Sequence, residues 1–368
     1  MKILEKVSEN STSPSSVRNL KRERARNGTH PLTGIGTLAL AGAGIGLGVA
    51  AYSFFVEPLK IGLERLTIRF ADGGDSIPPD GLRILHLSDT HFQGKDRREH
   101  AKIERIQRLT SGLECDIIVH TGDFLHFDDG LDNVTKLLDI LPQPRLGSYA
   151  VLGNHDYTHY AMGEALQCMW QAYQAETSRK RESRDFRLFG LPKHLLGFGR
   201  YVRNTPVEGR RTGSNDAVRL TRVLENRGIQ VLHNRSIRLQ SRPDGSAGRD
   251  LYLCGVDDVV EGRPYIDHAL DNVPPKAPTI LLSHNPDILR SPRIGQVDLV
   301  LSGHTHGGQI VLPLWGPAHT QVEFLTREHV SGSFRFNNTH VYITRGLGEG
   351  IPLRFGASPQ LALITVTA

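Results

Sequence analysis

Cysteine is scarce in this sequence of 368 residues, and its scarcity excludes two kinds of small scaffold. The three cysteines, Cys115, Cys168 and Cys254, form no CxxC pair and cannot all pair with one another. Neither a disulfide framework nor a zinc ribbon is therefore indicated. Cys115 and Cys254 border apolar runs, and we expect both to be buried.

Charge is missing altogether from residues 31–56, which contain no Asp, Glu, Lys or Arg and are long enough to cross a bilayer core as one helix. Six glycines lower the helix propensity of this segment. It follows a tail, residues 1–30, with seven Lys or Arg against three Glu, which we interpret as disordered and basic. The sequence predicts a transmembrane signal anchor in the cell membrane, with residues 57–368 on the non-cytoplasmic side. A signal peptide cleaved near Val49–Ala51 is the alternative.

The composition after residue 56 is typical of one large globular domain with many turns. Gly and Pro are frequent, at 38 and 20 residues of the whole chain. Five short apolar runs alternate with polar or helical stretches, which predicts an α/β fold. The runs lie at 83–88, 116–121, 148–153, 279–284 and 297–303, and each is expected to be a buried strand. The formal net charge of +5 suits an anionic partner or simply a solvated basic surface.

Each of these five runs ends in side chains of the types that bind metal ions. The endings are Ser-Asp-x-His, Gly-Asp, Gly-Asn-His-Asp, His-Asn-Pro-Asp and Gly-His-x-His. Ligands of open α/β sheets bind beyond the carboxyl ends of the strands, so these side chains are expected to meet. Any one motif alone is more often structural, but the five together predict a metal site. The expected ligands are Asp89, His91, Asp123, Asn154, His284, His304 and His306.

These ligand types suit two divalent ions. Asp89 and His91 leave one strand two residues apart and can project to the same side. The carboxylate of Asp123 has two oxygens with which to bridge two cations. Imidazoles with only two carboxylates favour Mn, our first choice, or Fe or Zn over an all-oxygen Mg site. Two dications beside two carboxylates would leave positive charge for a phosphate oxyanion.

The motifs resemble those of the calcineurin-like metallophosphoesterases, from Leu82 to the C-terminus. GVDD at 255–258 and RGLGEG at 345–350 are similar to the bacterial subgroup of membrane-anchored or exported members. The resemblance implies a sandwich of two mixed β-sheets flanked by helices. It further implies two ion sites that share one carboxylate: the first has Asp89, His91, Asp123 and His306, and the second has Asp123, Asn154, His284 and His304.

The same resemblance implies a phosphoester hydrolase in which a metal-bridging hydroxide attacks phosphorus in line. Asp123 and His155 would be the catalytic residues, with His155 protonating the leaving oxygen. In many members an Asp three residues after the bridging Asp orients this histidine, but here the position is His126. Asp156 or Asp128 is the candidate substitute.

Residues 160–213 form an apparent insertion relative to such bacterial members. Leu166, Met169, Trp170 and Tyr173 share one face of an expected helix, and residues 179–211 hold ten Lys or Arg against three acids. The simpler interpretation is a packed helix followed by a solvated basic loop. The other is a lid beside the metals that grips an acyl chain or meets anionic lipid headgroups.

The sequence thus predicts a phosphodiesterase or phosphatase that acts at the membrane surface on a phosphoester, which can be lipid-linked. The first alternative is a lipid-directed pyrophosphatase, because the subgroup also resembles the UDP-2,3-diacylglucosamine hydrolases of lipid A synthesis. An external catalytic domain would exclude it, since that substrate is cytoplasmic. A non-catalytic metal-binding scaffold would be expected to lack ligands, and none is missing. No nucleic-acid partner is expected, because the basic insertion has few aromatics on which bases could stack.

Overall fold

The structure, a computed structural model, describes residues 44–71, 76–95, 97–161, 170–176, 197, 200–201, 210–240 and 250–368. The chain divides into two units, residues 1–51 and residues 52–368. Residues 44–51, the described part of the first unit, are helical. None of the helices in the described part of the chain is both long and apolar enough to cross a membrane. The expected tail at 1–30, and residues 31–43 of the expected anchor, lie outside the described residues.

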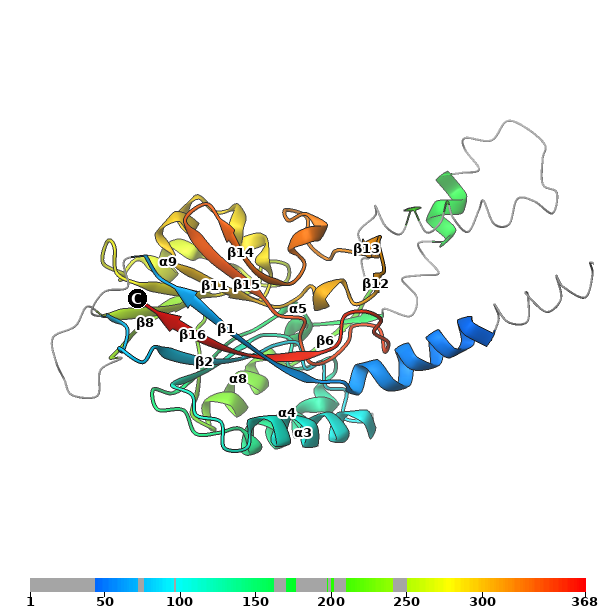
Figure 1. The fold of residues 1–368 in the computed structure, drawn as a ribbon, viewed down its shortest axis with the longest axis horizontal. Coiled ribbons are helices and arrows are strands. Elements are labelled where there is room, and N and C mark those ends of the chain that lie inside the picture. The colour runs from blue at the N-terminus through cyan, green and yellow to red at the C-terminus, as the bar shows by residue number, and fades with distance from the viewer. Residues whose placement is uncertain are drawn as a thin grey trace, which may run out of the picture. The chain divides into compact units, whose positions relative to one another are not determined.

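Two mixed six-stranded sheets form the framework of the second unit (Figure 1). The first has the order β1-β16-β2-β3-β4-β7, in which β2, β3, β4 and β7 are parallel and β16 runs antiparallel to β2. The second has the order β14-β15-β11-β10-β9-β8, with parallel inner strands and antiparallel edges. The bounds are Gly62–Arg69 for β1, Leu82–Leu87 for β2, Ile117–Thr121 for β3, Ser148–Val151 for β4, Ile229–Val231 for β7, Arg235–Leu239 for β8, Leu251–Gly255 for β9, Thr279–Leu282 for β10, Leu299–Ser302 for β11, Gly332–Phe336 for β14, Thr339–Ile343 for β15 and Gln360–Thr367 for β16.

Helices cover the outer face of each sheet, and two short antiparallel ribbons project from the loops. In Figure 1, α3, α4 and α8 lie over the first sheet and α9 over the second. The ribbons pair β5 with β6 and β12 with β13. The bounds are Arg97–Thr110 for α3, Leu131–Ile140 for α4, Asn154–Tyr157 for α5, Ala217–Glu225 for α8, Ile266–Leu270 for α9, Thr158–Ala161 for β5, Arg210–Ser214 for β6, Val311–Leu312 for β12 and Gly316–Pro317 for β13. Shorter helical turns are η1 Tyr52–Val56, η2 Glu57–Leu59, η4 Asp128–Gly130, η5 Pro286–Arg290, η6 Pro292–Gln296, η7 His306–Gly308 and η8 Arg327–His329.

The inner strands are mostly apolar on both faces, because both faces are buried. On β2, Leu85 and Leu87 pack against the helices, whereas Leu82 and Ile84 pack between the two sheets. Successive side chains of a strand point to opposite faces, so a strand between two cores needs an uninterrupted apolar run. Each such leucine or isoleucine contributes about 1.5–3 kcal/mol by leaving water.

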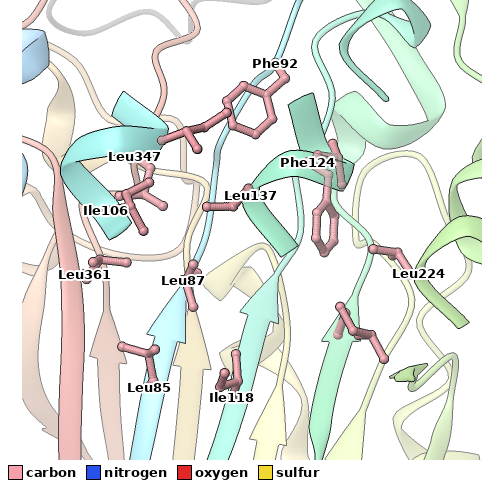
Figure 2. Packing of buried hydrophobic residues seen from close by; sticks show 14 of the residues in the cluster. Leu85, Leu87, Phe92, Ile106, Ile118, Phe124, Leu137, Leu224, Leu347 and Leu361 are labelled. Carbon is pink, nitrogen blue, oxygen red and sulfur yellow. The ribbon is translucent and has the colours of Figure 1, made fainter. Parts of the chain in front are cut away.

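The layer between the first sheet and its helices is shown in Figure 2. Ile106 of α3 and Leu137 of α4 point toward Leu87 of β2 and Ile118 of β3, and all four are buried. Phe92 and Phe124 belong to the same cluster, in the segments that follow β2 and β3. The loops that follow β2 and β3 are therefore anchored in this buried cluster where they leave the sheet.

The five expected strands are all confirmed, as β2, β3, β4, β10 and β11. Cys115 and Cys254 are buried, as expected, whereas Cys168 lies outside the described residues. The described part of the insertion includes helical backbone at 170–176, where Tyr173 is buried. Leu166, Met169 and most of the basic stretch at 179–211 lie outside the described residues.

A buried histidine in the core predicts an acid-sensitive fold. His86 on β2 is fully buried with its Nε2 2.9 Å from Oγ1 of Thr121, and burial lowers its pKa from 6.5 to about 3. Between these pH values the unfolded chain binds the extra proton, so the free energy of unfolding falls by about 1.4 kcal/mol per unit of decreasing pH. We expect His86→Gln, which does not titrate, to show a shallower fall in chemical denaturation between pH 6.5 and 3. Equal slopes in both proteins would contradict this assignment.

Candidate metal centre

The seven expected ligands come together at the carboxyl ends of the central strands of both sheets. Asp89 and His91 follow β2, Asp123 follows β3, Asn154 opens α5 just after β4, His284 follows β10, and His304 and His306 follow β11. All seven side chains are buried. The parallel course of β2, β3 and β4, and of β10 and β11, brings the loops of each sheet to one edge. Their roles as ligands stay a prediction.

One group of these side chains gathers around Asp89, His91 and His306, whose ligand atoms lie within 4.8 Å of one another. Nε2 of His91 lies 3.0 Å from Nε2 of His306 and 3.3 Å from Oδ2 of Asp123. Nε2 of His306 is also 3.8 Å from Oδ1 of Asp89. Two carboxylates and two imidazoles thus face one small volume, which we call the first cluster.

The second cluster consists of Asp123, Asn154, His284 and His304. Nδ1 of His304 lies 3.0 Å from Oδ1 of Asn154 and 3.1 Å from Nε2 of His284. Nδ1 of His284 is 2.7 Å from the carbonyl oxygen of Thr121, and Nε2 of His304 is 3.2 Å from that of Gln321. Each imidazole can donate its N–H to that carbonyl and present its other nitrogen to the cluster, which is the usual arrangement of metal-binding histidines.

Asp123 joins the two clusters through a single oxygen. Its Oδ2 lies 3.3 Å from Nε2 of His91 in the first cluster and 3.2 Å from Nε2 of His284 in the second. Its Oδ1 accepts a hydrogen bond of 2.8 Å from the backbone N–H of His155. One oxygen is therefore held in place while the other faces both clusters.

The backbone is strained where these side chains meet. Five of the seven, Asp89, His91, Asp123, His304 and His306, have φ between 47° and 70°. A left-handed conformation is uncommon for residues other than glycine and costs of the order of 1–3 kcal/mol each. Two glycines make the close approach possible: a Cβ on Gly303 would meet Asp89, and one on Gly153 would meet Asp123. The strained residues are therefore the ones whose side chains would need a fixed geometry to bind metal ions.

The chemistry of the clusters fits bound cations. Oδ2 of Asp89 is buried without a hydrogen-bond partner in the described part of the chain, and burial raises the pKa of this carboxyl to about 6. Burial lowers the pKa of His284, but the carboxylates of Asp123 and Asp89 outweigh it and raise that pKa to about 10. Buried acceptor atoms that face one another at 3.0–3.3 Å are unfavourable unless a proton or a metal ion lies among them.

His155 lies beside the clusters with its side chain buried. Its ring centroid is 4.5 Å from that of His91 and 5.0 Å from that of His126, and these three imidazoles form a third group able to hold an ion. Nδ1 of His155 has no hydrogen-bond partner among the residues that the structure describes. Burial lowers the pKa of His155, which favours the neutral form of the ring.

Neither candidate substitute for the missing aspartate orients His155. Asp156 accepts hydrogen bonds from the backbone N–H groups of Asp123, Leu125 and Gly153, at 2.8–3.0 Å. Asp128 accepts instead from the backbone N–H of Asp216 at 3.0 Å. The first carboxylate therefore fixes the loop that carries Asp123, and the second fixes the start of α8. The ring of His155 lies instead beside the rings of His91, His126 and Tyr160.

A buried ionic chain behind the first cluster was not predicted from the sequence. Arg354 is completely buried, donates to the carbonyl oxygens of Ala357 and Arg345 at 2.8 Å, and lies 3.4 Å from Nδ1 of His306. Its Nε is 3.4 Å from Glu349, whose carboxylate accepts from Nζ of Lys102 on α3 at 2.7 Å. The RGLGEG stretch was noted as a resemblance, but nothing local in it indicates these partners.

Glu349→Gln is expected to destabilise the fold strongly. The substitution leaves Lys102 and Arg354 buried beside a neutral group, and breaking a buried ion pair from one side costs about 3–5 kcal/mol. Chemical denaturation measures the loss. Glu114→Gln is the matched control, because Glu114 is exposed and pairs with Arg83 at 3.0 Å, an interaction expected to contribute less than about 1 kcal/mol. Equal losses in the two variants would contradict a special role for the buried chain.

A second unpredicted group forms a wall beside His155. Tyr160 of β5 lies with its ring centroid 4.8 Å from that of His155, and its hydroxyl donates to Glu261. Arg211 of β6 pairs with the same carboxylate at 2.8 Å. The β5–β6 ribbon begins and ends the insertion, so the insertion starts beside the candidate catalytic histidine. Asn215 completes this wall by donating to the carbonyl oxygen of His155 at 2.7 Å.

Comparisons with known proteins agree with one another. Residues 82–308 match the family model described as calcineurin-like phosphoesterase. The uncharacterised metallophosphoesterase YkuE of Bacillus subtilis is 29% identical, over 90% of this chain and 94% of its own. The UDP-2,3-diacylglucosamine pyrophosphatase LpxG of Chlamydia muridarum is 29% identical, over 84% of this chain and 90% of its own. The phosphodiesterase YaeI of Escherichia coli is 31% identical, over 85% of this chain and 91% of its own.

Proposed function

Because this chain belongs to the calcineurin-like phosphoesterase family and is a metal-dependent phosphoric ester hydrolase, we propose that it cleaves phosphodiesters at a membrane surface. Two features support the finer part of the proposal. One relative of similar length is named a phosphodiesterase. The charge-free segment at 31–56 precedes the catalytic unit and is long enough for a membrane anchor.

The observation that carries the proposal is the position of Oδ2 of Asp123 between the two clusters, 3.3 Å from His91 and 3.2 Å from His284. In our assignment the first cluster and the second cluster each hold one divalent ion, manganese being the first choice. Such a pair of ions stabilises charge on the phosphoryl oxygens and lowers the pKa of water so that it can serve as the nucleophile.

The protein's own groups then position and protonate the substrate. His155 is the proposed general acid for the leaving oxygen, because its ring is beside the first cluster and its backbone is fixed by Asp123. A phosphate anion beside that ring favours its protonated form and so offsets the effect of burial on its pKa. The ring of His155 also stacks on that of His126, which helps to position it.

A second candidate is a pyrophosphatase that acts on a nucleotide-linked lipid, favoured by the relative named UDP-2,3-diacylglucosamine pyrophosphatase. The two candidates differ in where the catalytic unit lies, because that substrate is cytoplasmic whereas the charge pattern around 31–56 places the unit outside. Reporter fusions made after residue 75 distinguish them. An external reporter excludes the second candidate, and a cytoplasmic one removes the main objection to it.

A substrate panel tests the reaction itself. The full chain, purified in detergent and loaded with one metal at a time, is assayed on phosphomonoesters, phosphodiesters and nucleotide-linked lipids. We expect metal-dependent hydrolysis that is fastest on diesters and is lost after chelation. Preference for monoesters would contradict the diester assignment, and preference for the nucleotide-linked lipids would favour the second candidate.

A further inference from the structure

Large hydrophobic side chains are exposed at one edge of the second unit. Of the ten such side chains in the described part of residues 52–368, six lie on two segments that flank one loop. Leu314 is completely exposed and Trp315 is 64% exposed. Large apolar side chains exposed together in this way indicate contact with another apolar body. We call the six residues the docking edge: Phe54, Phe55, Val56, Leu312, Leu314 and Trp315.

The loop at 351–355 holds both segments of the docking edge. On one side the backbone N–H of Arg354 donates to the carbonyl oxygen of Ser53 at 2.9 Å. On the other, the backbone N–H of Val311 donates to the carbonyl oxygen of Phe355 at 2.6 Å. Figure 1 shows β12 and β13 at the same end of the second unit as this C-terminal loop. The two apolar segments are therefore parts of one edge, although they are far apart in sequence.

The tip of the β12–β13 ribbon shows that the exposure is not explained by the fold alone. Leu314 has a φ of 66°, a left-handed conformation that is unfavourable for leucine. The backbone N–H of Trp315 donates to the carbonyl oxygen of Leu312 at 3.1 Å, which closes a tight turn. A strained turn that presents leucine and tryptophan to solvent gains nothing within the described structure, which indicates a contact with another body.

Cationic and aromatic side chains at the same edge fit the interface of a lipid bilayer. Nζ of Lys60 contacts the hydroxyl of Tyr52 at 3.2 Å, and the guanidinium of Arg98 lies 5.1 Å from the ring centroid of Phe54. Aromatic rings with adjacent lysine or arginine are typical of the headgroup region, where the ring enters the apolar layer and the cation meets phosphate.

Hydrogen bonds join the segments that carry the docking edge to the segments around the metal centre. The carbonyl oxygen of Gln321, in the segment after β13, is 3.2 Å from Nε2 of His304. Gln309, three residues after His306, donates from its side chain to the carbonyl oxygen of Leu353 at 2.8 Å. The β12–β13 ribbon and the loop at 351–355 are thus each joined to a segment that follows or contacts the clusters.

We propose that the docking edge contacts the lipid bilayer, with Leu314 and Trp315 entering the headgroup and upper acyl region. The charge-free run at 31–56 selects this occupant, because its last three residues are themselves part of the docking edge. A bilayer that holds this run would therefore lie next to the docking edge. One consequence, which rests on the proposed function, is that the metal centre takes phosphoesters carried by lipids.

Tryptophan fluorescence tests the contact without reference to activity. The chain has two tryptophans, so Trp170→Phe leaves Trp315 as the only one. The full-length variant is reconstituted with vesicles of phosphatidylcholine and phosphatidylglycerol whose acyl chains are brominated near the glycerol. We expect Trp315 to lose most of its emission compared with unbrominated vesicles, and Leu314→Asp to reduce that quenching while hydrolysis of soluble bis(p-nitrophenyl) phosphate is unchanged.

The matched control moves the tryptophan to another exposed apolar position. Val218 on α8 is 60% exposed, and Val218→Trp with Trp170→Phe and Trp315→Phe reports a surface away from the docking edge. Its emission is expected to be the same in both kinds of vesicle. Equal quenching at positions 218 and 315, no quenching at 315, or failure of the chain to float with vesicles would overturn the proposal. Self-association in detergent that shields Trp315, without quenching by brominated lipid, would assign the docking edge to a second copy instead.

Discussion

Replacing Asp123 by asparagine is expected to lower turnover by more than the roughly 10²–10³-fold that the loss of one transition-state hydrogen bond costs. The substitution retains an amide oxygen for the backbone N–H of His155 but removes the negative charge between His91 and His284. Without that charge two dications at the two-metal spacing would repel each other with little compensation. We therefore expect the purified variant to hold fewer than two ions per chain.

Two measurements check this result, namely turnover on a phosphodiester and elemental analysis of the protein after metal loading. Asp132→Asn is the matched control, because Asp132 is exposed on α4 and its loss removes the same charge at a distance from the clusters. Normal turnover with two bound ions in the Asp123 variant would show that the clusters do not share this carboxylate.

His155→Ala is expected to slow hydrolysis of a substrate with an unactivated leaving group by about 10²–10⁴-fold. The reason is that a poor leaving group needs a proton as the bond to phosphorus breaks, and the ring of His155 lies beside the first cluster. A p-nitrophenolate leaving group needs no proton, so the same variant should hydrolyse such an ester at a rate much closer to normal. The split between the two substrates is the measurement.

Metal content separates two possible roles of this histidine. His155 belongs to the third imidazole group, with His91 and His126, and a ligand role there would make His155→Ala lose an ion. A role as general acid predicts unchanged metal content. His268→Ala, at an exposed position on α9, is the control for the loss of an imidazole. Unchanged turnover with the unactivated substrate would remove His155 from the mechanism.

The sequence predicted the central strands and the meeting of the seven side chains because both depend on local pattern. A mostly apolar run such as LRILHL at β2 indicates burial on both faces, and parallel strands deliver their following residues to one edge. The backbone conformation of His91 and His306 could not be predicted in this way, because histidine seldom adopts a left-handed φ. Their strain is set by tertiary contacts.

Long-range pairing accounts for what the sequence did not predict. Lys102 and Glu349 are 247 residues apart, and each alone is typical of a solvated surface position. The expectation that Asp156 or Asp128 supports His155 was wrong for a related reason. Closeness in sequence suggests that such a carboxylate is the partner of the histidine. In the structure, however, both carboxylates accept hydrogen bonds from backbone N–H groups of neighbouring loops.

The place of β16 has a consequence for how the enzyme matures. This strand, Gln360–Thr367, lies between β1 and β2, which were synthesised some three hundred residues earlier. During translation every proposed ligand emerges before it, so an incomplete chain has all seven side chains but only a split first sheet to support them. Catalytic competence would then arise in a single step, when β16 inserts between β1 and β2 and the loop ahead of it brings Arg354 behind His306.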